Sequence, residues 1–120
     1  MNKINFPAEW YPQSGVQLTW PDCETEWEPF LPEVIECYRN IALEISKRET
    51  LVIVCRDKEQ CLTDLEGIPT ENIIFKEIEL NDTWARDHGG ISVFGANGEK
   101  IVLDFIFNGW GLKFHADLDN

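Results

Sequence analysis

Hydrophobic and polar positions alternate near the start of the chain. Over residues 15–20, Val16, Leu18 and Trp20 fall on one side and polar or small residues on the other. A spacing of two is the side-chain periodicity of a β-strand. The pattern therefore predicts a half-buried strand that ends before Pro21.

From Leu31 the apolar residues change to the three-and-four spacing of an amphipathic helix. The positions that follow this spacing are Val34, Ile35, Tyr38, Ile41, Ala42 and Ile45. Glu33 and Glu36 lie in the first turns and Lys47 and Arg48 in the last, which complements the helix macrodipole. We expect a long helix over this segment.

Three further elements follow the long helix. Residues 51–55 are a continuous apolar run, which is typical of a strand buried on both faces in a sheet covered by helices. A shorter helix is expected over 58–65, ending at Gly67, and another strand over 73–78.

A hairpin is predicted from residues 90–94 and 101–107, closed around Ala96-Asn97-Gly98. Asn-Gly supplies the positive φ angles that a tight turn needs. With this hairpin, the order strand, helix, strand, helix, strand, hairpin predicts an α/β fold. No helix or strand is predicted to close the chain, which therefore resembles an unfinished domain.

Composition limits the classes of partner. The 120 residues include 22 acidic and 10 basic side chains, for a net charge of −12, and 43% are hydrophobic. Clustered Lys and Arg dominate nucleic-acid binding, so this charge excludes nucleic acid as the expected partner. The hydrophobic content favours one folded domain with a real core. The negative charge is explained by a solvated surface, or alternatively by the attraction of a cationic ligand.

No apolar run has the length of a signal sequence or of a membrane span, so we expect a cytoplasmic protein. Cys23, Cys37, Cys55 and Cys61 are irregularly spaced and are expected to be free thiols. None of them forms C-x-x-C and only two histidines are present, so no zinc site is predicted.

Two segments concentrate side chains with functional chemistry. Residues 81–90 hold Asn81, Asp82, Trp84, Arg86, Asp87 and His88 between two predicted strands. Loops at strand ends are frequent binding sites, but an Asp-rich turn with Arg86 paired to a nearby acid is the alternative. In residues 108–111, glycines surround Trp110, which indicates either a ligand wall or a turn with a packed tryptophan.

Asp104 is the third candidate, because it lies between Leu103 and Phe105 in the predicted second strand of the hairpin. A buried carboxylate must find donors or a cation. The alternative is that Asp104 lies on the wetter face of that strand.

Several long strings resemble, in order, the opening third of the agmatine deiminase and bacterial peptidyl-arginine deiminase family. They are Phe6-Pro7-Ala8-Glu9-Trp10, Val16-Gln17-Leu18-Thr19-Trp20-Pro21, Asn81-Asp82-Thr83-Trp84-Ala85-Arg86-Asp87-His88-Gly89 and Leu103-Asp104-Phe105 through Phe107-Asn108-Gly109-Trp110-Gly111-Leu112-Lys113-Phe114. Strings of this length in register are more specific than a short motif.

The resemblance implies a partial pentein propeller, with residues 1–120 as one or two of five ββαβ modules and no internal boundary. It also implies hydrolysis of a guanidinium to a ureido group with loss of ammonia: agmatine gives N-carbamoylputrescine, or protein-bound arginine gives citrulline. The family's nucleophilic cysteine and catalytic histidine are expected beyond Asn120, so this chain alone is predicted to be inactive. The family commonly has histidine where this sequence has Cys23.

The resemblance assigns substrate binding to Asp87, which would grip the guanidinium, and to Trp84, which would wall the pocket. Asp82, Asn81 and Trp110 are further substrate-binding candidates. Neither a metal nor another cofactor is expected, and the partner is a small cationic guanidine or an arginine side chain, with a homodimer as the family's common assembly. The alternative is a non-catalytic module that binds such ligands or associates with a partner through uncovered strands.

Overall fold

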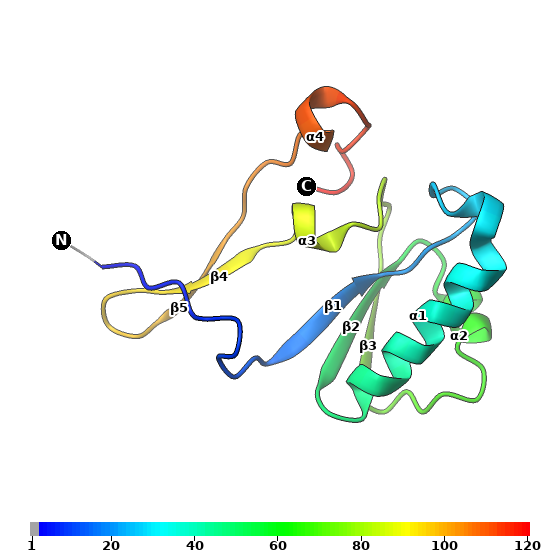
Figure 1. The fold of residues 1–120 in the computed structure, drawn as a ribbon, viewed down its shortest axis with the longest axis horizontal. Helices are drawn as coiled ribbons and strands as arrows, with labels where there is room; N and C mark the ends of the chain where they lie inside the picture. The colour runs from blue at the N-terminus through cyan, green and yellow to red at the C-terminus, as the bar shows by residue number, and fades with distance from the viewer. Residues whose placement is uncertain (1–2) are drawn as a thin grey trace.

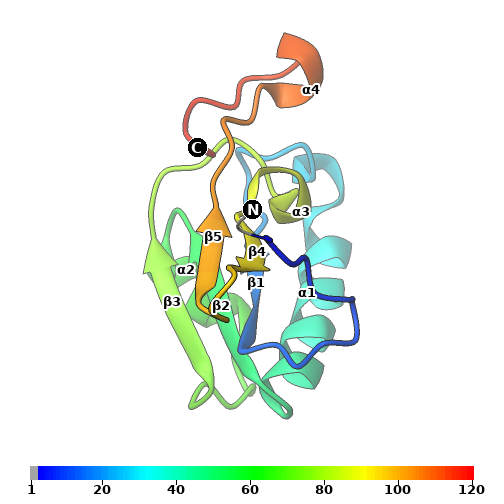
Figure 2. The same cartoon turned by 90° about the vertical axis from the view of Figure 1, so that its left-hand side faces the viewer.

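The computed structural model describes residues 3–120 and confirms the α/β arrangement (Figure 1). β1 (Gly15–Thr19), β2 (Thr50–Cys55) and β3 (Ile73–Glu77) form a parallel sheet in that order. The connections run through the 3-10 turn η1 (Glu28–Phe30) with α1 (Leu31–Ser46), and then through α2 (Lys58–Asp64). Both long connections place their helices on the same face of the sheet (Figures 1 and 2).

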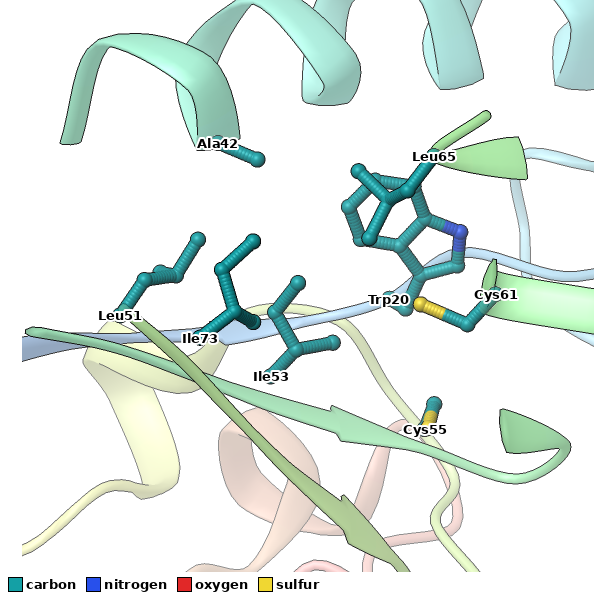
Figure 3. Close-up of a cluster of buried hydrophobic side chains, with 8 residues drawn as sticks. All are labelled: Trp20, Ala42, Leu51, Ile53, Cys55, Cys61, Leu65 and Ile73. Carbon is teal, nitrogen blue, oxygen red and sulfur yellow. The ribbon is translucent and has the colours of Figure 1, made fainter. Parts of the chain in front are cut away.

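The core lies between this face of the sheet and the two helices (Figure 3). Leu51 and Ile53 point from β2 toward α1, where Ala42 faces them, and all three side chains are fully buried. Replacing either large residue with alanine is expected to cost about 2 to 5 kcal/mol of stability. Trp20 closes one end of the core and its indole N–H donates to Asp64 Oδ2 at 2.9 Å.

The alternation in β1 is confirmed, because Val16, Leu18 and Trp20 all contact this core. The prediction that the strand over 51–55 is buried on both faces is wrong for this chain. In β2 fully buried residues alternate with half-buried ones, since α1 and α2 cover one face only. The continuous apolar run thus has a second face that these two helices do not cover.

The long helix is shorter at its carboxyl end than its charge pattern predicts. α1 ends at Ser46, so Lys47 and Arg48 lie just beyond the last turn, where both contact Glu44. Ile41 follows the apolar spacing but is exposed. α2 agrees closely with its prediction and is capped by the Asp57 carboxylate, which accepts from the Gln60 amide.

The hairpin is confirmed, but its second strand is shorter than predicted. β4 (Ile91–Phe94) pairs with β5 (Lys100–Leu103), and residues 104–107 leave the sheet. The Gly98 amide donates to the Gly95 carbonyl, and only Gly98 in this loop has a positive φ. The loop is therefore a longer turn with one left-handed residue rather than a tight turn with two.

The hairpin extends away from the sheet on the side opposite α1 and α2 (Figure 1). The N-terminal segment crosses it, since Asn5 and Phe94 exchange two backbone hydrogen bonds of 2.7 and 2.8 Å. Of the helices within residues 3–120, none combines the length and apolar character that a membrane crossing requires.

Two single helical turns lie inside segments that the sequence analysis assigned to loops. α3 (Ala85–His88) follows Trp84, and α4 (Gly109–Leu112) lies near the end of the chain. In α4 the interior residues Trp110 and Gly111 both have left-handed backbone angles. The glycines around Trp110 therefore permit a tight turn, and the expectation that no helical element occurs near the chain end is corrected.

Candidate functional site

The candidate site lies at the end of the molecule where the carboxyl ends of the three parallel strands meet (Figure 2). Arg56 follows β2 and holds this edge together. Its guanidinium donates to both carboxylate oxygens of Asp22 at 2.8 and 3.2 Å, and to the Leu80 carbonyl at 2.6 Å. The hydrogen bonds that Arg56 donates to Asp22 raise the pKa of Arg56 above its usual value. One partly buried cation thus joins the segments that follow all three strands.

Asn81 and Asp82 are held by the C-terminal tail. The Asp119 carboxylate accepts from the backbone N–H groups of Asn81 at 2.7 Å and Asp82 at 3.0 Å. In return the Asn81 side chain accepts from the Leu118 amide at 2.8 Å. Neighbouring Asn120 exchanges two hydrogen bonds with the backbone of Phe107. Residues 116–120 therefore brace both segments that carry candidate residues.

The Asp82 side chain is buried, and its Oδ1 accepts a hydrogen bond from the Trp84 backbone amide at 2.9 Å. The carboxylate thus helps to hold the loop. Burial raises the pKa of the Asp82 carboxyl, and the like charges of Glu26 and Asp119 act in the same direction. The Asp-rich-turn interpretation is therefore confirmed for Asp82. Its second half is wrong, because Arg86 forms no ion pair with any residue of the described range 3–120.

Trp84 presents much of its indole to solvent, with 49% of its surface exposed. Its ring centroid lies 6.1 Å from that of Trp27, tilted by 40°. The Trp84 indole N–H donates to Glu26 Oε1 at 2.8 Å, and the Trp27 indole N–H donates to the Thr83 hydroxyl at 3.0 Å. The ring is thus held at its edge while one part of it remains free for a ligand.

Asp87 lies one turn beyond Trp84 on α3, where its backbone amide donates to the Trp84 carbonyl at 2.9 Å. The carboxylate is exposed and has no hydrogen bond or ion pair within residues 3–120. Four of the five predicted binding residues therefore share one loop. Asn81 and Asp82 hold the loop in shape, whereas Trp84 and Asp87 are the two with free surface.

Trp110 belongs to the other segment and packs at right angles against Phe107 at 4.9 Å and Phe114 at 5.8 Å. The ring is thus packed within a turn, while 42% of the Trp110 surface is exposed, so its role as a ligand wall stays a prediction. His88 connects this aromatic group to α3, since its ring centroid lies 6.0 Å from that of Phe107. Asp104 is exposed beyond the end of β5, so the interpretation of Asp104 as a buried carboxylate is wrong.

Two of the surface hollows within residues 3–120 are lined by neither Trp84 nor Asp87. The larger, about 450 Å³, lies beside the aromatic segment, with Ile106, Phe114 and Asn120 among its lining residues. The smaller, about 360 Å³, lies between Trp10 and Arg48. Within residues 3–120 no three His, Cys, Asp or Glu side chains are grouped for metal binding. Asp87 and Trp84 are exposed at the surface and line neither hollow.

The four cysteines are free thiols, as predicted. Cys55 and Cys61 are buried, and burial raises the pKa of both thiols. A thiol that stays protonated is a poor nucleophile, so these two are structural. Cys23 and Cys37 are exposed.

A sequence model of the Porphyromonas-type peptidyl-arginine deiminase family matches residues 5–120. The chain belongs to this family. Among curated relatives, the agmatine deiminase of Stutzerimonas stutzeri is 32% identical over 108 residues, which are 90% of this chain and 29% of that enzyme. The chain therefore spans less than a third of the length of this relative.

Solved structures of family members superpose closely on the chain. A cysteine-to-serine variant of C. jejuni agmatine deiminase with substrate bound gives a TM-score of 0.89 at 30% identity, covering 98% of this chain and 34% of that one. A putative arginine deiminase from Porphyromonas gingivalis gives 0.84 at 45% identity, covering 98% and 34%. The fold is thus that of about a third of a deiminase of this family.

The sequence analysis missed Glu26, Trp27 and Asp119, although each contacts residues 81–84. Glu26 and Trp27 lie in the segment after β1, and the predicted parallel sheet was a signal for them. Segments that follow neighbouring parallel strands meet at the same sheet edge. Asp119 lies in an irregular tail, where no periodicity indicates a contact.

Proposed function

We propose that this chain is the N-terminal part of a cysteine-dependent guanidine hydrolase that converts agmatine and water to N-carbamoylputrescine and ammonia. The observation that carries the proposal is the braced loop with an unpaired, exposed Asp87 beside a half-exposed Trp84, in a chain that belongs to a deiminase family. Relatives described as agmatine deiminases support agmatine as the substrate.

Asp87 binds the guanidinium in this proposal. A guanidinium is planar and permanently charged, and its N–H groups form a fork that matches the two oxygens of a carboxylate. Each charge-assisted hydrogen bond contributes about 1.5 to 3 kcal/mol. Because no cation in residues 3–120 forms an ion pair with Asp87, none of them has to be displaced when the ligand binds.

Trp84 forms the wall next to this carboxylate. A cation over the face of an indole gains about 0.5 to 2 kcal/mol, depending on how much water is excluded. Asp82 and Asn81 fix the backbone of the same loop and complete the binding set through it. Trp110 forms a second wall, held by its packing against Phe107.

The reacting groups are supplied by polypeptide beyond Asn120. A cysteine thiolate forms a C–S bond with the central guanidinium carbon, and a histidine protonates the nitrogen that leaves as ammonia. Water then attacks the thiouronium carbon, the C–S bond breaks, and the ureido product and free thiol result. Side chains perform each step, so no cofactor is proposed, and the 120-residue chain alone is inactive.

The rest of the protein completes the fold. We place residues 1–120, as one piece without an internal boundary, in a pentein propeller of five ββαβ modules. This placement accounts for side chains near α4 that are apolar but largely exposed in the chain by itself: Phe105, Ile106, Leu112 and Phe114. Apolar surface of this kind is normally covered by further polypeptide.

The test is turnover of agmatine by the full-length protein, measured as ammonia and N-carbamoylputrescine. Loss of two charge-assisted bonds, about 3 kcal/mol, predicts that Asp87→Asn lowers kcat/KM at least about a hundredfold. Glu71→Gln is the matched control, because it removes one exposed negative charge just before β3. Glu71 thus lies where the parallel strands begin, whereas Asp87 lies where they end. Unchanged turnover in Asp87→Asn, or ammonia release by the 120-residue chain, contradicts the proposal.

A second candidate substrate is protein-bound arginine. The observation that favours it is that the family model matching residues 5–120 is that of the Porphyromonas-type peptidyl-arginine deiminases. An arginine side chain offers the same guanidinium to Asp87. Assays with agmatine and with an arginine-containing peptide, which yields citrulline, separate the two candidates.

A further inference from the structure

The indole of Trp84 is fixed by a side chain far away in the sequence. Glu26, in the segment after β1, accepts the indole N–H at 2.8 Å across 58 residues of sequence. The same Oε1 lies 3.4 Å from the Thr83 hydroxyl oxygen, which donates to it. Thr83 in turn accepts from the Trp27 indole at 3.0 Å. The four side chains form a chain of hydrogen bonds along one edge of the Trp84 ring.

These contacts restrict a ring that packing alone leaves partly free. Almost half of the Trp84 surface is exposed, and within residues 3–120 its one aromatic contact is the tilted pair with Trp27 at 6.1 Å. A half-exposed aromatic ring retains alternative rotamers, which it must give up when a ligand stacks on it. A hydrogen bond to a carboxylate that selects one orientation reduces this loss before the ligand arrives.

We propose that Glu26 is a positioning residue, which holds Trp84 in the orientation that receives a guanidinium next to Asp87. The inference rests on the proposed function and adds a residue to it that the sequence motifs do not single out. Glu26 acts through the Trp84 indole N–H rather than by touching the substrate. Its negative charge is therefore dispensable, whereas its acceptor oxygen is required.

The substitutions separate these two properties. Glu26→Gln keeps an acceptor oxygen at the same distance along the side chain and removes the charge. Glu26→Ala removes both. Trp84→Phe keeps a ring and removes the indole N–H, so Glu26 has nothing to hold in this background. Glu28→Ala is the matched control, because Glu28 is an exposed acid of the same segment without a side-chain hydrogen bond or ion pair within residues 3–120.

The kinetic test uses the full-length protein with agmatine. We expect Glu26→Ala to raise KM about tenfold with kcat within about twofold, because a wall that binds ground state and transition state alike affects binding only. Glu26→Gln and Glu28→Ala should stay within about twofold of the unsubstituted protein. Adding Glu26→Ala to Trp84→Phe should change KM by less than about twofold, because the two groups act as a unit.

Two kinetic results would overturn the inference. If Glu26→Gln is as defective as Glu26→Ala, the charge itself contacts the substrate. If Glu26→Ala has its full effect in the Trp84→Phe background, Glu26 acts through some other group. An unsubstituted full-length protein that turns over neither agmatine nor peptidyl arginine contradicts the proposed function instead, so the two failures are distinguishable.

A second measurement tests the contact in the 120-residue chain without turnover. Hydrogen exchange of the indole N–H groups, followed by NMR, should be at least about fivefold faster for Trp84 in Glu26→Ala. The Trp20 indole, which donates to Asp64, is the internal reference and should not change. Equal exchange at Trp84 in both proteins would show that Glu26 does not hold the ring.

Discussion

Asp119 gives the sharpest test of how the candidate loop is held. Its carboxylate accepts the backbone N–H groups of Asn81 and Asp82 at 2.7 and 3.0 Å. Asp119→Ala removes the Oδ1 oxygen that accepts both hydrogen bonds and leaves two partly buried donors unpaired. Hydrogen bonds to a charged acceptor contribute about 1.5 to 3 kcal/mol each. Repulsion between Asp119 and Asp82 opposes this gain, so we expect a net loss of about 2 kcal/mol.

The expected effect is local opening of the tail from the loop rather than global unfolding, because the core lies between the sheet and α1. A loss of about 2 kcal/mol corresponds to roughly thirtyfold faster amide exchange at Asn81 and Asp82. Exchange measured by NMR on the 120-residue chain should show this increase, while the Ala42 amide in α1 keeps its rate.

Asp117→Ala is the control, since Asp117 is an exposed acid of the same tail and its side chain forms no hydrogen bond or ion pair within the described part of the chain. Asp119→Asn keeps an acceptor oxygen but removes the charge that strengthens both hydrogen bonds, so it should give an intermediate rate. Identical exchange at Asn81 in Asp119→Ala and Asp117→Ala would refute the reasoning, because the tail would then add nothing to the stability of the loop.

Three further predictions concern stability. Burial raises the pKa of the Asp82 carboxyl, so its ionisation disfavours the folded chain at neutral pH. Asp82→Asn should therefore raise the thermal midpoint at pH 7. This gain should vanish below pH about 4, where the carboxyl is protonated in both the folded and the unfolded chain. Arg56→Met leaves its partner carboxylate partly buried and unpaired, which should lower the free energy of unfolding in urea by about 2 to 3 kcal/mol. In Gly109→Ala the new Cβ meets the Phe114 carbonyl oxygen at a position with a positive φ, so this variant should reduce the near-ultraviolet circular dichroism of the aromatic segment. In Gly111→Ala the φ is also positive but the surrounding space is open, so this variant should lower the free energy of unfolding by only about 1 kcal/mol. A flat pH response in Asp82→Asn, an unchanged urea midpoint in Arg56→Met, or equal spectra for the two glycine variants would contradict these predictions.

Much of the fold could be predicted because local spacing reflects backbone geometry. The three-and-four pattern after Leu31 requires one helical face, and α1 lies there. The two-residue alternation of β1 likewise requires one buried side, and Trp20 is buried on it. The end of the second hairpin strand could not be predicted, because residues 104–107 are as apolar as a strand but find no partner to pair with.

Of the candidate site too, one part could be predicted from the sequence and another part could not. The motif around Asp87 was visible in the sequence because its residues are neighbours. The sequence alone did not indicate that Asp82 is buried while Asp104 is exposed, because Asp82 has polar neighbours in the sequence and Asp104 has apolar ones. Which of two similar carboxylates loses its water depends on the segments that pack over it. For Asp82 the C-terminal tail is one of these segments.

By itself, the sequence determined the order of the strands and of the two longer helices, the membership in a deiminase family, and the loop in which Trp84 and Asp87 lie. Only the tertiary structure decided what holds that loop: Glu26 from the segment after β1, and Asp119 from the tail. The reason is physical. Periodicity is a property of adjacent residues, whereas these contacts exist only once three parallel strands bring their carboxyl ends to a common edge.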